Sequence, residues 1–430
     1  MIKYIFLILL VFINNCSFNS NSKFWTKEKK VEQLSKNVKK IFEDEKVISK
    51  EFNENITVKI PKNISNNFNQ LSNNLEIKNL NFNIKKTSKF KFSKIENFNY
   101  FEPELVFDGN NFIYFDDKGN ILKFGRDFQI IWKKNFYSKQ EKKNKPILSF
   151  AIANNTLIIF DNLSKLYAVD LVTGNLIWSK NNKNPFNSQI KVFDNKIYAI
   201  DMSNILRCYS LLDGSEIWQF KSEDTFLKST KRNSLIIRNE KVFFNNSMGD
   251  ITAVDAKNGS LLWQIPTQSS LIYENAFSLV MSDLVSDNKN IIFSNNRNEF
   301  YSLNLVNGFL NWKQKINSSV RPIFYDQFIF TISDEGYFFV IDGKSGNVIR
   351  ITDIFNIFGK NKRENIKPIG FVATLNKLIL STSNGRVIVI DIKSGKVDSI
   401  FKIDNEKISR PFIFDNKIIL VKNDSIIRLN

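Results

Sequence analysis

The stretch Leu166-Tyr-Ala-Val-Asp-Leu-Val-Thr-Gly-Asn-Leu-Ile-Trp178 decides the fold, because it recurs along the chain in close, short and degraded copies. The close copies are Leu206–Trp218, Ile251–Trp263 and Phe300–Trp312, a shorter one ends at Trp132, and degraded ones are Asp342–Arg350 and Asp391–Ser399. Successive copies lie about 40–50 residues apart, which is the usual length of a four-stranded propeller blade. The repeat therefore predicts a β-propeller.

Each copy has the composition of two strands joined by a tight turn. A run of β-branched and aromatic residues favours a strand, and an Asx-rich turn containing a glycine reverses it. The glycine, Gly174 in the first copy, suits a position with positive φ. Upstream hairpins such as Asn154–Phe160 and Asp194–Ile200 complete the repeat. We expect four short strands in each repeat, with the indole of Trp178 and its counterparts buried between adjacent blades.

The number of copies predicts eight blades. Seven copies of the turn unit are visible, and the segment from Arg410 to Asn430 resembles an eighth blade that stops after about three strands. An N-terminal strand near Leu80–Lys86 is expected to supply the fourth strand, because closure of the ring removes exposed sheet edges. The expected fold is thus all-β, an eight-bladed propeller of four-stranded antiparallel blades. Seven blades is the alternative.

The N-terminus has the features of a secretion signal. A short basic start is followed by the apolar run Tyr4–Ile13, which is too short to cross about 30 Å of hydrocarbon as a helix. The run ends just before Cys16, and it resembles a bacterial lipoprotein signal in which this cysteine becomes the lipidated N-terminus. Asn15 departs from the small residue usual there, while Ser17 resembles the outer-membrane sorting pattern. The alternative is an ordinary signal peptide with a chance cysteine.

These features divide the chain into three parts. We expect a signal peptide over residues 1–15, a tether over 16–79 and the propeller over 80–430. Apolar residues at helical spacing, from Val31 to Phe42, favour an amphipathic helix over residues 27–50 of the tether. A solvated spacer is the alternative.

Composition excludes several kinds of chemistry. The chain has no histidine, which removes histidine-based acid–base and nucleophile systems and most catalytic zinc sites. Its formal net charge is +18, but the basic residues are scattered, so we expect no nucleic acid partner. Of the two cysteines, Cys208 holds a repeat position taken by Ala168, Ala253 and Ser302 in other copies. It is therefore interpreted as a small packing residue.

The pattern formed by Ala168, Asp170, Gly174 and Trp178 resembles the tryptophan-docking motif of pyrroloquinoline-quinone (PQQ) propellers. The resemblance covers about residues 80–430, and the docking tryptophans it implies are Trp132, Trp178, Trp218, Trp263 and Trp312. Two functional classes share this motif, the quinoprotein dehydrogenases and the outer-membrane assembly lipoproteins of the BamB family. The motif is specific for the fold but does not separate the two classes.

Length and chemistry favour the BamB family. Quinoprotein dehydrogenases are typically longer, carry a calcium site of Glu, Asn and Asp beneath the quinone, and commonly have an adjacent cysteine pair, which this chain lacks. The resemblance to BamB implies a non-enzymatic scaffold without catalytic residue, metal or cofactor, lipid-anchored at the outer membrane and facing the periplasm. Its implied partners are the periplasmic domains of BamA and other barrel assembly subunits. A PQQ-dependent dehydrogenase and an envelope propeller with another protein partner remain alternatives.

Two segments correspond to BamA-binding stretches of the family. A Leu-x-Leu-Arg stretch corresponds to Thr225–Lys228, and an Asp-x-Asp stretch corresponds to Asp283–Val285, where the second acid is missing unless Asp287 replaces it. The implied partner-binding residues are Phe226, Leu227, Lys228, Asp283 and Leu284. Phe226 and Leu227 are expected to anchor the partner, with Lys228 and Asp283 orienting it by charge. For Asp283 the alternative is a solvated loop acid.

Overall fold

The computed structural model describes residues 48, 50–59, 74, 87–223, 231–267 and 279–429. The predicted signal peptide 1–15, the lipid-attachment residue Cys16 and nearly all of the predicted helix 27–50 lie outside this range, as do Phe226, Leu227 and Lys228. Among the described residues, no helix has the length and apolar character needed to cross a membrane.

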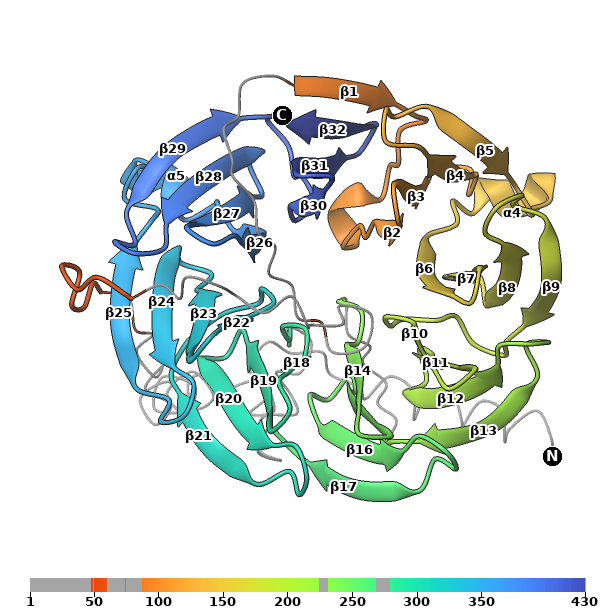
Figure 1. The fold of residues 1–430 in the computed structure, drawn as a ribbon, viewed down its shortest axis with the longest axis horizontal. Coiled ribbons are helices and arrows are strands. Elements are labelled where there is room, and N and C mark those ends of the chain that lie inside the picture. The colour runs from red at the N-terminus through yellow and green to blue at the C-terminus, as the bar shows by residue number, and fades with distance from the viewer. Residues whose placement is uncertain are drawn as a thin grey trace, which may run out of the picture. The chain divides into compact units, whose positions relative to one another are not determined.

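The described chain forms eight four-stranded antiparallel sheets arranged in a ring, as predicted (Figure 1). We number them blades I to VIII and give the strands of each from the channel outward. Blades I to IV consist of β2 (Val106–Asp108), β3 (Asn111–Phe115), β4 (Ile121–Phe124), β5 (Ile130–Lys134); β6 (Leu148–Ala153), β7 (Thr156–Asp161), β8 (Lys165–Asp170), β9 (Leu176–Asn181); β10 (Lys191–Phe193), β11 (Lys196–Ile200), β12 (Ile205–Ser210), β13 (Glu216–Lys221); β14 (Leu235–Arg238), β15 (Lys241–Asn245), β16 (Ile251–Asp255), β17 (Leu261–Ile265).

The second half of the ring repeats this arrangement. Blades V to VIII consist of β18 (Val285–Ser286), β19 (Asn290–Asn295), β20 (Glu299–Asn304), β21 (Leu310–Gln314); β22 (Ile323–Tyr325), β23 (Phe328–Ile332), β24 (Tyr337–Asp342), β25 (Val348–Asp353); β26 (Pro368–Ala373), β27 (Lys377–Thr382), β28 (Arg386–Asp391), β29 (Val397–Lys402); β30 (Phe412–Phe414), β31 (Lys417–Lys422), β32 (Ser425–Leu429), β1 (Thr87–Lys91). The short helices η2 (Phe98–Tyr100), α4 (Lys139–Lys143) and α5 (Lys360–Arg363) lie in connections between strands.

The ring is closed by pairing of the two ends of the propeller. Strand β1 runs antiparallel to β32, from Thr87 opposite Leu429 to Lys91 opposite Ser425. An N-terminal closing strand was predicted and is confirmed, but it begins directly after the expected range Leu80–Lys86, which lies outside the described residues. The alternative of seven blades is wrong.

The middle strands of each blade are buried on both faces because a neighbouring blade packs on each side. In β7 and β11 every residue after the first is buried. Such strands are continuous apolar runs rather than alternating ones. The outermost strand β9 is mostly exposed by contrast, and its single half-buried residue is Trp178.

Each docking tryptophan lies against the turn glycine of the next blade. Trp178 contacts the turn of blade III, where a Cβ atom on Gly214 would lie 2.6 Å from the indole. The indole N–H of Trp178 also donates a hydrogen bond to the carbonyl of Leu211, at 3.1 Å. The contacts from one indole to the next glycine are Trp132 to Gly174, Trp218 to Gly259, Trp263 to Gly308 and Trp312 to Gly346. The tryptophans thus occupy equivalent positions around the ring.

A small residue faces four of the five tryptophans across the outer hairpin, whereas Trp132 faces Lys123. Cys208 is directly opposite Trp218, and Ala168 is opposite Trp178 in the same register. The register shifts immediately after both pairs, which marks a β-bulge in each hairpin. Cys208 has no exposed surface, and burial raises the pKa of its thiol to about 12. The interpretation of this cysteine as a packing residue is therefore confirmed.

Candidate functional site

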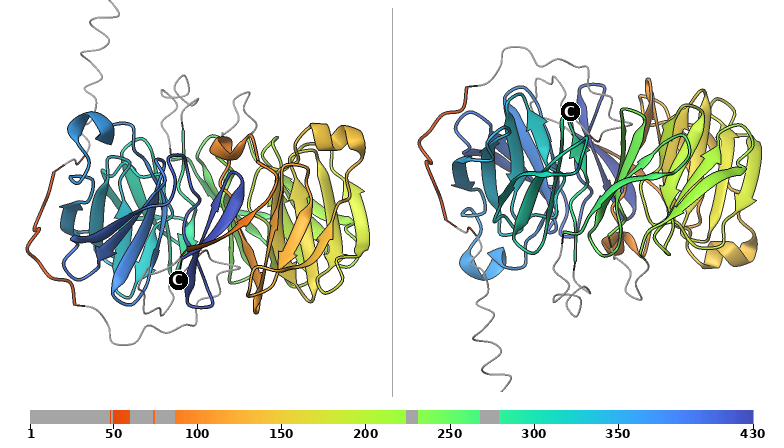
Figure 2. Two further views of the ribbon diagram at one scale, coloured as in Figure 1. Left: turned by 90° about the horizontal axis from the view of Figure 1, so that it is seen from above. Right: turned by 90° about the horizontal axis from the view of Figure 1, so that it is seen from below.

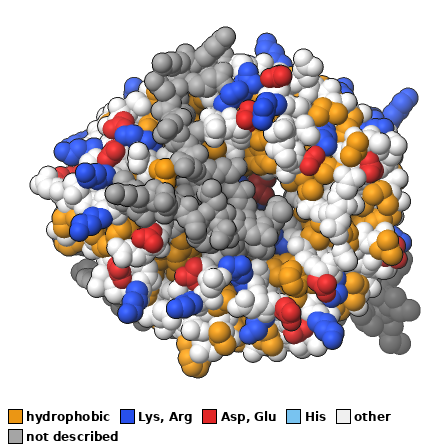
Figure 3. Space-filling model, in the orientation of Figure 1, with side chains coloured by type: hydrophobic (Ala, Val, Ile, Leu, Met, Phe, Trp, Pro, Cys, Tyr) orange, Lys and Arg blue, Asp and Glu red, His pale blue; other side chains and the backbone are white. Residues whose placement is uncertain are grey.

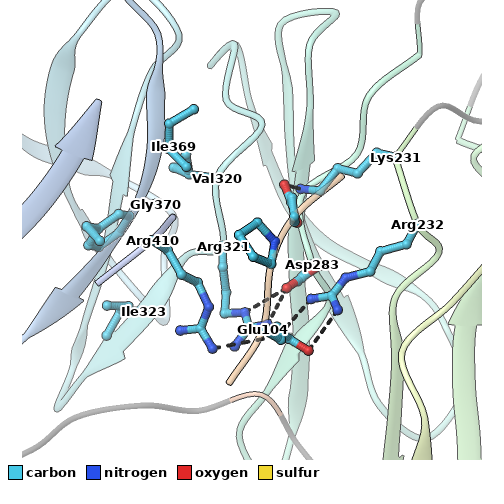
Figure 4. Close-up of a pocket in the computed structure, with 13 residues that line it drawn as sticks. Glu104, Lys231, Arg232, Asp283, Val320, Arg321, Ile323, Ile369, Gly370 and Arg410 are labelled. Carbon is cyan, nitrogen blue, oxygen red and sulfur yellow. Dashed lines mark hydrogen bonds and ion pairs between the residues drawn. The ribbon is translucent and has the colours of Figure 1, made fainter. Parts of the chain in front are cut away.

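The channel wall is formed where the chain enters the innermost strand of each blade. Six polar side chains hold the same position, two residues before that strand: Glu104, Gln189, Asn233, Asp283, Arg321 and Arg410. Because the ring brings these equivalent positions to its axis, the charged members of the set converge on one another (Figure 4).

A repeated serine fixes the backbone before three of these residues. The hydroxyl of Ser188 accepts the N–H of Ile200 on the second strand, at 2.7 Å, and donates to the carbonyl of Gln189, also at 2.7 Å. Ser282 and Ser409 make the same pair of bonds beside Asp283 and Arg410. These short side chains compete for backbone groups at the start of a strand and define the local turn.

Three guanidinium groups gather around one carboxylate in the channel. Arg232 holds Glu104 with two hydrogen bonds of 2.7 Å, and the nearest nitrogens of Arg321 and Arg410 lie 3.2 and 3.6 Å from the same carboxylate. Arg321 also bonds Asp283 through Nε at 2.8 Å. Arg321 therefore bridges the two acids, and paired, charge-assisted bonds of this kind are the strong ones.

These groups line a pocket with an empty volume of about 560 Å³, its open mouth included. Four cationic and three acidic side chains contribute to it, together with apolar residues of blades VI and VII. Elsewhere on the face shown in Figure 3, Lys and Arg side chains are distributed around the ring rather than gathered in one patch.

The electrostatics keep both channel acids ionised. Burial is the largest influence on the pKa of Glu104 and raises it, but the charges of Arg232, Arg321 and Arg410 together hold it well below its usual value. Burial also raises the pKa of Asp283, and the charges of Arg321, Lys231 and Arg232 again outweigh it and lower the pKa. Neither carboxyl is thus poised to donate or accept a proton near neutral pH.

A residue from far upstream reaches the same channel wall. The side-chain amide of Asn74 donates to Gln189 Oε1 at 3.0 Å and to the carbonyl of Leu284 at 2.8 Å, and its oxygen accepts from Lys191 Nζ at 2.7 Å. Gln189 in turn donates to Asp283 at 3.1 Å. The amide is therefore joined to the ion-pair cluster by one continuous chain of hydrogen bonds.

Two of the predicted partner-binding residues lie inside this network. Asp283 is 3% exposed and bonded to Arg321, so the alternative that it is a solvated loop acid is wrong. Leu284 has no exposed surface, and its N–H donates to Ser234 Oγ at 2.9 Å. A partner therefore reaches neither side chain without a rearrangement of the channel. Their part in partner binding, like that of Phe226, Leu227 and Lys228, stays a prediction.

The arginines of the channel were not identified from the sequence, although a signal for them exists. Arg321-Pro322 and Arg410-Pro411 are the same dipeptide at the same place in two blades. Proline has no N–H and fixes φ, which suits the first residues of a strand. A repeated Arg-Pro at this position marks a channel-lining arginine.

The residues present do not fit the calcium and quinone site of the dehydrogenases. Within the part of the chain that the structure describes, no group of three or more Cys, Asp, Glu or His side chains is placed to hold a metal ion. Glu104 and Asp283, two of the three acids that line the pocket, are both bonded to arginine rather than free for a cation. A hard divalent cation requires several such oxygen ligands together.

Comparisons with known proteins agree with this fold. BamB from Moraxella catarrhalis has a TM-score of 0.66 and 12% sequence identity, covering 81% of this chain and 100% of that one. A europium-containing methanol dehydrogenase has a TM-score of 0.60 and 12% identity, covering 81% and 87%. The quinohemoprotein alcohol dehydrogenase from Comamonas testosteroni has a TM-score of 0.59 and 10% identity, covering 81% and 76%. A search of the curated proteins found no match.

A family comparison also matches this chain by sequence. Residues 117–352 match the family described as outer membrane protein assembly factor BamB. This match spans more than half of the chain and includes all five docking tryptophans named above. The chain belongs to the BamB family of outer membrane protein assembly factors.

Proposed function

We propose that this propeller is a non-enzymatic scaffold of the outer-membrane β-barrel assembly machinery. It binds the periplasmic domains of BamA and assists insertion of outer-membrane proteins. The observation that carries the proposal is the match of residues 117–352 to the assembly-factor family. The channel supports it, because its acids are neutralised by arginines instead of being available for catalysis.

The channel network also supports a role for the predicted contacts at residues 226–228. Lys231 and Arg232 directly follow residues 224–230, which contain the predicted contacts Phe226, Leu227 and Lys228. Lys231 bonds Glu102 at 3.2 Å and the carbonyl of Ser319 at 2.8 Å, while Arg232 is held by Glu104. The network therefore fixes Lys231 and Arg232, the two residues that directly follow residues 224–230 in the sequence.

Asp283 fits the same proposal as a positioning residue. It is bonded to Arg321, which also bonds Glu104, the carboxylate that holds Arg232. Loss of Asp283 would loosen this network, and so the hold on Arg232, without removing a direct contact to the partner.

The proposal includes attachment to the membrane. Residues 1–15 are the signal peptide, Cys16 carries the lipid, residues 16–79 form the tether and residues 80–430 form the propeller. The protein is then held at the outer membrane and faces the periplasm. An acyl chain buried in the bilayer holds such a body at the surface without spanning it. Mass spectrometry of the purified membrane form tests this point by the presence or absence of acylated Cys16.

Binding to purified BamA periplasmic domains tests the scaffold function. Truncation of an apolar anchor near an interface centre typically weakens binding by about 2 kcal/mol, or about 30-fold, so Leu227→Ala is expected to do so. Leu212→Ala is the control, since Leu212 is 85% exposed on the rim of the ring. If the wild-type protein retains no BamA domain at low or moderate salt, the proposal fails. Co-isolation of a different envelope protein would then favour an envelope propeller with another partner.

A second candidate is a PQQ-dependent dehydrogenase. The observation that favours it is the likeness in fold to methanol and alcohol dehydrogenases, with TM-scores of 0.60 and 0.59. Added quinone and calcium would then give a protein-bound chromophore and substrate-dependent reduction of a dye. An unchanged absorption spectrum after both additions excludes this candidate.

A further inference from the structure

A segment from before the propeller lies along the outer edge of blade VI. Residues 50–59 run beside β25, as Figures 1 and 2 show for the red segment of the chain. Phe52 forms an antiparallel bridge with Ile351. The N–H of Phe52 donates to the carbonyl of Ile351 at 3.1 Å, and the N–H of Ile351 donates back at 2.9 Å. The segment thus extends the sheet beyond its fourth strand.

Side chains add to this main-chain pairing on both sides. Asn53 donates to the carbonyl of Ile349 at 3.2 Å, and Glu51 accepts the N–H of Asp353 at 3.1 Å. At the far end, Val58 is 3% exposed and packs into the apolar core shared by blades VI and VII. Its N–H donates to the carbonyl of Lys393, in the outer turn of blade VII, at 3.0 Å.

The segment meets the ring where the repeat loses its tryptophan. Arg350 pairs with Val340 in the register that Trp178 has with Ala168. It lies against the next turn glycine, as the indoles do, with a Cβ on Gly395 falling 2.9 Å from its guanidinium carbon. Arg350 is therefore the docking residue of blade VI.

The guanidinium makes a contact that an indole does not. Its Nη1 and Nη2 donate to the carbonyls of Lys393 and Ile392 in the next blade, at 2.6 and 2.9 Å. Nη1 also donates to the carbonyl of Ile56 in the added segment, at 3.0 Å. An indole has one N–H, which four of the five docked tryptophans direct to the next blade, whereas a guanidinium has five donors and can bind both.

Because Arg350 is buried, its charge depends on the carbonyls that accept its hydrogen bonds. Arg350 has no exposed surface, and burial lowers its pKa to about 10. The hydrogen bonds that the structure gives it in the described part of the chain all end on main-chain carbonyls. A buried charge is unfavourable unless hydrogen bonds satisfy it, so loss of the carbonyl of Ile56 would affect the whole site.

The edge of blade VI differs from those of other blades. On β9 the equivalent residue Ser179 is exposed, while Ile351 on β25 is 3% exposed. Among the described residues, no bridge outside the named strands reaches an outermost strand except that of Phe52. The site therefore combines the main-chain groups at the outer edge of β25 with the buried guanidinium of Arg350, a donor that the tryptophan-bearing blades lack.

We propose that the outer edge of blade VI is a binding site for an extended polypeptide strand, with Arg350 as the residue that selects it. Its ligand has free main-chain groups at one residue, a carbonyl four residues later and a small β-branched side chain two residues after that. Residues 50–59 supply these features as Phe52, Ile56 and Val58, and are the resident ligand. This proposal does not rest on the function proposed above.

The resident strand is exchangeable with a strand of the same kind. Phe52 and Ile56 remain 45% and 43% exposed, and the sheet pairing consists of one bridge with two main-chain bonds. An intramolecular ligand of this kind competes through its high effective concentration, in the millimolar range for short flexible connections. Weakening residues 50–59 therefore opens the edge to a strand supplied in trans.

Hydrogen exchange on the full chain tests the role of Arg350. Arg350→Trp introduces the residue that blades I to V carry at this position, so the ring is expected to fold while residues 50–59 are released. The amides of Phe52, Val58 and Ile351 are then expected to exchange at least about tenfold faster, with unchanged protection in blades I to IV. Trp312→Phe changes the same position of blade V and is expected to leave these three amides unaffected. Unchanged exchange in Arg350→Trp overturns the proposal.

A peptide-binding experiment tests the site itself. The probe is a fluorescent synthetic peptide with the sequence of residues 48–59, and the protein is the full chain with Phe52→Pro and Val58→Asp. Phe52→Pro removes the N–H that bonds Ile351, and Val58→Asp opposes burial. This variant is expected to bind the peptide at least about tenfold more tightly than the wild type or the same variant with Arg350→Trp. Equal binding to all three, or no binding once exchange shows that the segment is released, overturns the proposal.

Discussion

Trp178 lies on Gly214 so closely that only a glycine fits beneath the indole. Gly214 has a φ of +69°, and an added Cβ would lie 2.6 Å from two atoms of the ring. The turn of one blade is therefore shaped by the aromatic side chain of the blade before it. The same contact recurs at the other docked tryptophans, so the repeat motif describes the interface between blades as much as a single blade.

Gly214→Ala is expected to destabilise the ring by about 2–4 kcal/mol, because it adds a clash with the indole to the strain of a positive φ. Gly109→Ala is the matched control. Gly109 has a φ of +53° but no atom within 4 Å of an added Cβ, so we expect a loss of about 1 kcal/mol from strain alone. Denaturant unfolding followed by tryptophan fluorescence measures both. Equal losses would show that the contact with Trp178 adds nothing.

Trp218 provides a second comparison, because its indole N–H has no acceptor among the described residues although Trp178 bonds Leu211. Replacement by Phe removes a similar part of the ring in both cases, but only Trp178→Phe breaks a hydrogen bond. We expect Trp178→Phe to lose about 1 kcal/mol more stability than Trp218→Phe. Thermal and denaturant midpoints of the two variants test this. A larger loss of stability for Trp218→Phe than for Trp178→Phe would contradict the view that only the Trp178 indole donates a stabilising hydrogen bond.

The ring was predictable because its signals are local and repeated. Gly174 and Trp178 lie within one hairpin motif, and every copy of the motif carries the same information about the contact with its neighbour. The closing strand was placed too early for the opposite reason. Thr87–Lys91 has only one strongly apolar residue, Phe90, and its position depends on the free edge of β32 rather than on its own composition.

The channel was not predictable in the same way. Arg232 and Arg321 meet Glu104 across 128 and 217 residues of sequence, and only ring closure brings them together. Asp283 was identified by resemblance to a loop motif, yet it is buried by that same closure. Arg350 was interpreted as part of a degraded copy, whereas it docks on Gly395 and holds the carbonyl of Ile56.

Arg321→Met is expected to destabilise the ring by about 3 kcal/mol at neutral pH, since it leaves Asp283 buried and ionised without its main partner. The pKa of Asp283 is lowered in the folded state, so its ion pair stabilises the fold above the unfolded pKa near 4 and is lost as pH falls. In the variant the acid can instead be protonated, so the difference from wild type should shrink toward pH 4.

Denaturant midpoints at pH 7 and pH 4 measure this difference. Arg126→Met is the control, because Arg126 pairs with Asp415 at 3.1 Å while its side chain is 52% exposed. Exposed pairs contribute at most about 1 kcal/mol. A loss in Arg321→Met no greater than in this control would contradict a stabilising role for the channel network.

Lys191 should make the ring more stable as the solution becomes alkaline. Burial, followed by the charge of Arg321, lowers the pKa of Lys191 to about 7, against an unfolded value near 10.4, although the charges of Glu104 and Asp283 oppose this shift. Below about pH 7 both states carry the ammonium and the folded state bears its full desolvation penalty. Between about pH 7 and 10 the unfolded state binds more protons, so stability rises with pH.

Lys191→Met is expected to abolish this alkaline rise, which in the wild type is on the order of a few kcal/mol. The stability of the variant relative to wild type should therefore be highest near pH 7. This relative stability should fall toward pH 10, as the wild type becomes more stable. Lys196→Met, on the adjacent strand and paired with Asp194 at the surface, is the control that should retain the rise. The measurement is the denaturant unfolding midpoint of each protein between pH 7 and pH 10. If the midpoint changes with pH in the same way in wild type and in Lys191→Met, Lys191 keeps its proton in the folded channel.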